Sequence, residues 1–65
     1  MDNKKLRALR ILAGLNQKQL AETADVTQPY ISFIETGKAI PTREIREKLA
    51  AILKVDSAEL FREKV

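Results

Sequence analysis

The stretch QKQLAETADVTQPYISFIE, residues 17–35, contains two helical patterns separated by a very short connection. In the first, Leu20 and Ala21 begin a narrow apolar stripe. In the second, Ile31 and Ile34 stand three positions apart, which is the spacing of one buried helix side. Only two or three residues remain for the connection, so the helices must cross sharply. The stretch therefore predicts a helix-turn-helix.

The ends of these two helices are marked by polar residues. Asn16 and Gln19 have the spacing of a capping box, which predicts that Asn16 precedes the first helix. Thr27 is the expected cap of the second, with Gln28 as the alternative. Asp25 lies where the chain must reverse, and aspartate tolerates the left-handed conformation better than most residues other than glycine.

The rest of the chain predicts three further helices. One covers about residues 4–13 and stops at Gly14. Another begins after Thr42, and the last begins with a capping box at Asp56 and Glu59. No segment shows sustained period-two alternation, so no strand is expected. The expected fold class is all-α with five helices.

Composition limits the function. The 65 residues predict one domain, 1–65, and contain no cysteine and no histidine. The commonest zinc ligands and catalytic bases are thus missing, so we expect no enzyme, no metal site and no cofactor. Neither a membrane span nor a signal peptide is evident, which predicts a cytoplasmic protein with no membrane partner. The net charge of +3 is compatible with nucleic acid but decides nothing.

The order of several motifs resembles a known family. The runs LRALRILAGLNQKQLAETADVTQPYISFIETGKAIP and EKLAAILKVDSAELF are similar to lambda-repressor-like, Cro/XRE-type helix-turn-helix domains, over about residues 5–61. The resemblance implies a five-helix DNA-binding domain with its helix-turn-helix at about 17–36. Members are mostly bacterial or phage regulators that bind operators as dimers. It also implies that the third helix is the recognition helix.

The outward side of that third helix carries the expected base contacts, which are Gln28, Pro29, Ser32 and Phe33. Gln28 can form paired hydrogen bonds with adenine, and an exposed Phe33 can touch a thymine methyl group. Pro29 offers shape or methyl contact only. Alternatively, Gln28 is an ordinary polar first-turn residue, and Phe33 packs on its own helix or on another protein.

Expected contacts with the DNA backbone flank this helix. Gln17 presents an amide beside unpaired helix N–H groups, which favour an anion, and the resemblance implies that it braces Gln28. Tyr30 is as well explained by packing, and each lysine or arginine by a solvated surface charge. The full set is Asn16, Gln17, Lys18, Thr27, Tyr30, Thr36, Lys38 and Arg43.

The resemblance also implies a structural ion pair between Arg10 and Glu35, with an Arg10–phosphate contact as the alternative. By the same resemblance Leu60 and Phe61 form a dimer surface, although they could equally seal the monomer core. This chain departs from the family pattern elsewhere. Ile11 and Leu12 are expected to extend the core or to form a modest interface, and Ile40 is expected to pack beneath Pro41.

The sequence thus predicts a double-stranded DNA-binding transcriptional regulator of the repressor type, acting as a homodimer on an operator. Two alternatives remain open. An antitoxin or a restriction-modification controller uses the same fold. A helical protein-interaction module would instead present Ser32 and Phe33 to a protein.

Overall fold

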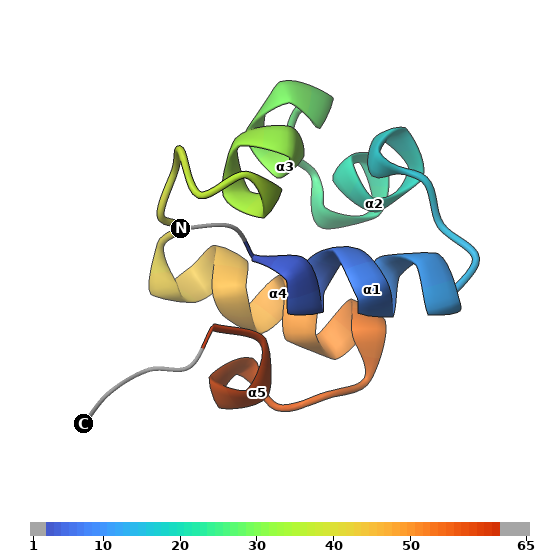
Figure 1. Cartoon of the computed structure of the whole chain (residues 1–65), viewed down its shortest axis with the longest axis vertical. Coiled ribbons are helices and arrows are strands. Elements are labelled where there is room, and N and C mark those ends of the chain that lie inside the picture. Colours follow the sequence, from blue (N-terminus) through green and yellow to red (C-terminus); the bar gives the residue numbers. More distant parts are fainter. Residues whose placement is uncertain (1–2, 62–65) are drawn as a thin grey trace.

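The computed structural model describes residues 3–61, which form five α-helices and their connections (Figure 1). They are α1 (Lys4–Leu12), α2 (Gln17–Ala24), α3 (Gln28–Glu35), α4 (Arg43–Leu53) and α5 (Ser57–Phe61). Helices α2 and α3 pack against each other, and α5 packs beneath α1 and α4 (Figure 1). These residues contain no strand, so the predicted all-α fold of five helices is confirmed. None of these helices has the length and apolar character of a membrane span.

Side-chain caps begin α2, α3 and α4 at the predicted residues. Asn16 Oδ1 accepts from the Gln19 N–H at 2.7 Å, and Gln19 Oε1 accepts from the Asn16 N–H at 2.8 Å. The Thr27 and Thr42 hydroxyls each accept from a backbone N–H three residues ahead, at 3.3 Å. Of the two caps considered for α3, Thr27 is therefore the one used, and Gln28 is the first helical residue.

The turn between α2 and α3 depends on one left-handed residue. Asp25 has φ 61° and ends α2, as its place in the sequence predicted. The next N–H, of Val26, bonds to the Ala21 carbonyl at 2.9 Å, which closes the helix end. Lys54 ends α4 in the same conformation, with φ 60°. Both residues occupy positions that glycine usually fills.

Among residues 3–61, ten buried apolar residues from all five helices form the core. Ile31 and Ile34 are 0% and 2% exposed, so the predicted inner side of α3 is confirmed. Ala21 is 2% exposed, and its small side chain allows α2 to approach its neighbours closely. The remaining members are Leu6, Leu20, Ala24, Leu49, Ala50, Leu53 and Leu60.

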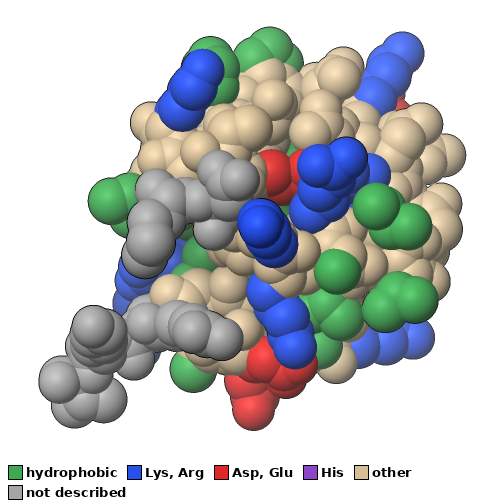
Figure 2. Space-filling model, in the orientation of Figure 1, with side chains coloured by type: hydrophobic (Ala, Val, Ile, Leu, Met, Phe, Trp, Pro, Cys, Tyr) green, Lys and Arg blue, Asp and Glu red, His purple; other side chains and the backbone are tan. Residues whose placement is uncertain are grey.

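Three apolar residues outside the core test further expectations, and one of them lies elsewhere than expected. Ile40 is 87% exposed, so the prediction that it packs beneath Pro41 was wrong, whereas Pro41 itself is buried. The reason is that buried and exposed side chains alternate along this segment, so the inward position of Pro41 leaves Ile40 facing outward. Ile11 and Leu12 are 58% and 82% exposed, so of the two alternatives they do not extend the core, and the modest interface stays a prediction. Figure 2 shows apolar side chains gathered over the C-terminal end of α1.

Replacing Asp25 with glycine should raise the free energy of unfolding by about 0.5–1 kcal/mol, because glycine adopts the left-handed conformation without a Cβ clash. Asp25→Ala should lower it, since alanine has the Cβ but lacks the short polar side chain that eases this conformation. Urea unfolding followed by circular dichroism measures both. A glycine variant less stable than the parent protein would contradict this account of the turn.

Candidate nucleic-acid interface

The four predicted base-contacting residues share the outward side of α3. Gln28 and Pro29 are exposed, Phe33 is 47% exposed, and Ser32 is half-buried. The helix is held from behind by its two buried isoleucines. Its outward side therefore belongs to the molecular surface, as the sequence predicted.

This surface offers hydrogen bonding at one end and apolar contact at the other. Within residues 3–61 the Gln28 amide forms no hydrogen bond, so its donors and its acceptor are available to a partner. Phe33 lies one helical turn and a half further on and exposes its ring. Among the described residues there is no group of three or more His, Cys, Asp or Glu side chains that could hold a metal ion.

The eight residues predicted to contact the DNA backbone lie around α3 at the ends of neighbouring elements. Gln17 and Tyr30 are half-buried, and the other six are exposed, namely Asn16, Lys18, Thr27, Thr36, Lys38 and Arg43. All eight side chains are therefore at least partly accessible at the molecular surface.

Their hydrogen bonds make some of them better phosphate ligands than others. A phosphate only accepts hydrogen bonds at its oxygens, so its partner must have a free proton. The Thr27 hydroxyl accepts from a backbone N–H and keeps its own proton. The Thr36 hydroxyl already donates to the Ser32 carbonyl at 2.9 Å and would have to rotate. Arg43 Nε lies 3.3 Å from Glu47 Oε2, an exposed pair that holds the guanidinium only weakly.

A buried cluster of charges lies behind the N-terminus of α2 and the C-terminus of α3. Arg10 Nε donates to Glu35 Oε2 at 2.7 Å, and one terminal nitrogen of Arg10 lies 3.4 Å from the other carboxylate oxygen. The two side chains are only 10% and 4% exposed. Arg10 also donates to the Leu15 carbonyl at 2.9 Å. The ion pair implied by the resemblance is therefore present, and Arg10 faces inward, away from any phosphate.

Gln17 completes this cluster in a way that the sequence did not predict. Its amide nitrogen donates to Glu35 Oε1 at 3.1 Å. Within the described part of the chain, Gln17 and Gln28 form no hydrogen bond with each other, so the expected brace is missing. The Gln17 amide donates to the Glu35 carboxylate instead, because a charged oxygen is the stronger acceptor. The second N–H and the oxygen of the Gln17 amide remain available.

Asn3 is a positioning residue that the sequence prediction missed. Its side-chain oxygen accepts from the Leu6 N–H at 2.9 Å and caps α1, while its side-chain nitrogen donates to the Leu60 carbonyl at 3.0 Å. Its backbone N–H donates to the Glu35 carbonyl at 2.8 Å. Asparagine directly before a lysine- and leucine-rich helix is a recognisable cap signal. Nothing in the sequence marks the two long-range bonds.

The two residues expected at a dimer surface have different positions. Leu60 is 2% exposed and belongs to the monomer core, so its side chain is not available to a second copy. Phe61 is half-buried and packs at the edge of the core. For Leu60, the alternative of sealing the core is thus the one that the structure shows.

Removing either partner of the buried ion pair should lower the free energy of unfolding by about 3–5 kcal/mol, because the other charge is left buried and unpaired. Arg10→Met and Glu35→Leu test this separately. The double variant should be much closer to the parent protein than the sum of the two. Denaturant unfolding of all four proteins gives the coupling. Single variants that each lose less than about 1 kcal/mol would show that the pair is solvated.

Comparison with known proteins agrees with this geometry. Two proteins of Mycobacterium tuberculosis, from strains CDC 1551 / Oshkosh and ATCC 25618 / H37Rv, are each 32% identical to this chain over 56 residues. Both are named as uncharacterized HTH-type transcriptional regulators. The match covers 86% of this chain and 40% of each relative, so the chain spans less than half their length. A family model described as helix-turn-helix matches residues 6–60, and the chain belongs to that family.

Proposed function

We propose that this chain binds double-stranded DNA sequence-specifically, as part of a transcriptional regulator of the repressor type. Helix α3 enters the major groove, and two copies bind two half-sites of one operator. The observation that carries the proposal is the outward side of α3. It exposes Gln28 and Phe33 while Ile31, Ile34 and Glu35 fasten the helix from behind.

The contacts follow from the chemistry of these side chains. An α-helix fits the major groove of B-DNA, and the residues of its N-terminal end meet the base edges. Gln28, the first residue of α3, has a free amide that matches N6 and N7 of adenine. The exposed ring of Phe33 matches a thymine methyl group. Pro29 and Ser32 complete the contact with the groove floor.

The proposed backbone contacts hold this helix in register. Thr27 donates its free hydroxyl proton, and Gln17 the remaining N–H of an amide that Glu35 already orients. Lys18, Lys38 and Arg43 add exposed positive charge around the helix. Asn16, Tyr30 and Thr36 are the remaining members of the set. Contacts of this kind position the protein and carry no sequence information by themselves.

A homodimer supplies the second half of the interface. One eight-residue helix meets only a few base pairs, and helix-turn-helix dimers place their recognition helices about 34 Å apart on successive turns of the groove. Phe61 is the proposed contributor to the dimer surface from α5, since Leu60 is buried. Binding at a promoter would act by occupancy.

The Gln28→Ala variant should relax preference at a single base position, with a loss of roughly 1–3 kcal/mol for the preferred base. The site is first obtained by selection from a random DNA pool, and affinities are then measured for all four bases at each position. Ser57→Ala, in α5 and outside the proposed interface, is the matched control and should bind as the parent protein does. Unchanged specificity in Gln28→Ala would show that this residue does not contact a base.

The Lys38→Ala variant should weaken binding to all sequences alike and make the salt dependence shallower by about one unit per subunit, because one phosphate contact releases its counterion. Titrations of the selected site and of a scrambled site at several salt concentrations measure both effects. An effect confined to the selected site would assign Lys38 to a base instead. A parent protein that binds neither DNA at low salt would favour a protein-interaction module.

A further inference from the structure

The segment that joins α3 to α4 alternates between inward and outward side chains. Ala39 is half-buried and Pro41 is buried, whereas Lys38, Ile40 and Thr42 are exposed. Ile40 is therefore exposed together with Lys38 and Thr42, three positions before Arg43.

Hydrogen bonds at both ends attach this segment to the C-terminal part of α3 and to the start of α4. The Phe33 carbonyl accepts from the Lys38 N–H at 2.7 Å and from the Ala39 N–H at 3.1 Å. At the other end the Thr42 side chain caps α4. The position of Ile40 is thus set relative to Phe33, one of the proposed base contacts.

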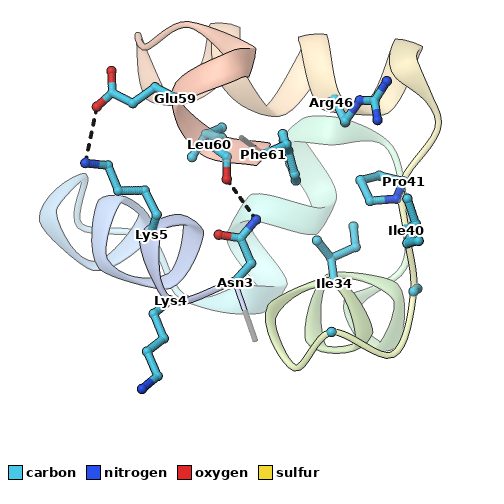
Figure 3. A pocket seen from close by; sticks show the side chains of 12 residues that line it. Asn3, Lys4, Lys5, Ile34, Ile40, Pro41, Arg46, Glu59, Leu60 and Phe61 are labelled. Atoms are coloured by element: carbon cyan, nitrogen blue, oxygen red, sulfur yellow. Dashed lines mark hydrogen bonds and ion pairs between the residues drawn. The ribbon is translucent and has the colours of Figure 1, made fainter. Parts of the chain in front are cut away.

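Ile40 is the most exposed large apolar residue among those described, at 87%. It stands at the rim of a hollow of about 620 Å³ whose floor includes Ile34, Pro41 and Phe61, but it does not fill that hollow (Figure 3). A single exposed isoleucine needs no explanation by itself. What distinguishes Ile40 is its position in the sequence between Lys38 and Arg43, two exposed basic residues that are proposed to contact phosphates.

We propose that Ile40 packs against deoxyribose of the DNA backbone, between the phosphates bound by Lys38 and Arg43. The sugar presents C–H groups, which suit an aliphatic side chain and are the same at every base pair. This inference rests on the proposed DNA binding. It assigns to Ile40 an apolar contribution to affinity that has no sequence preference and releases no counterion.

The experiment compares Ile40→Ser with Ile40→Leu and Ala51→Ser. Ala51 is the control because it is also exposed but lies near the C-terminal end of α4, eight positions beyond Arg43. Affinity for the selected site and for a scrambled site is measured by fluorescence anisotropy at four salt concentrations. Circular dichroism melting of each variant verifies folding, which the exposure of both positions should leave intact.

The expected result is that Ile40→Ser binds both DNAs about fivefold more weakly per subunit, which corresponds to losing roughly half of one isoleucine burial. The salt slope should equal that of the parent protein, in contrast to Lys38→Ala. Ile40→Leu should restore most of the affinity, and Ala51→Ser should lose none.

Three outcomes would overturn the inference. Ile40→Ser could bind as tightly as the parent protein while Lys38→Ala binds more weakly, which leaves DNA binding intact and removes Ile40 from the interface. The loss could be confined to one base position, which would make Ile40 a base contact. It could also coincide with weaker self-association in sedimentation, which would place Ile40 against a second copy. A parent protein that binds neither DNA at low salt would refute the proposed function itself.

Discussion

The buried carboxylate of Glu35 is the contact on which the arrangement of α3 depends. Its oxygens accept hydrogen bonds from Arg10 in α1 and from Gln17 in α2, and its carbonyl accepts from the backbone of Asn3. Three separate parts of the chain thus meet at the last residue of α3. Such a pair adds little net stability compared with an apolar replacement, but here its hydrogen bonds join α3 to α1 and to α2. These contacts hold the outward side of α3 in its orientation.

Most of the fold could be predicted because its signals are local. Helix starts are marked by residues whose side chains reach only three positions ahead, as at Asn16, Thr27 and Thr42. The left-handed residue Asp25 is likewise identified by its immediate neighbours. Spacing of apolar residues then tells which side of each helix faces the core. For a bundle of short helices with short connections, these signals leave few possible arrangements.

The outward side of α3 was predictable for the same reason, but its supporting contacts were not. Gln17 has several acceptors within plausible reach, and only the assembled bundle shows that Glu35 is the one it uses. The bonds of Asn3 join residues 57 positions apart at the longest. Leu60 and Ile40 illustrate the same limit for apolar residues. Each could be core or surface by type, and the path of the neighbouring backbone decides between them.

The bond from Asn3 to the end of α3 has a practical consequence for how the protein is handled. The residue nearest the amino end of the described chain touches the helix proposed to enter the groove. An affinity tag or a fusion partner joined shortly ahead of Asn3 is therefore close along the chain to a contact with that helix. A bulky or strongly charged addition there would disturb the hydrogen bond from the Asn3 N–H to the Glu35 carbonyl, whereas Gly14, in the loop after α1, forms no hydrogen bond with α3 among the described residues.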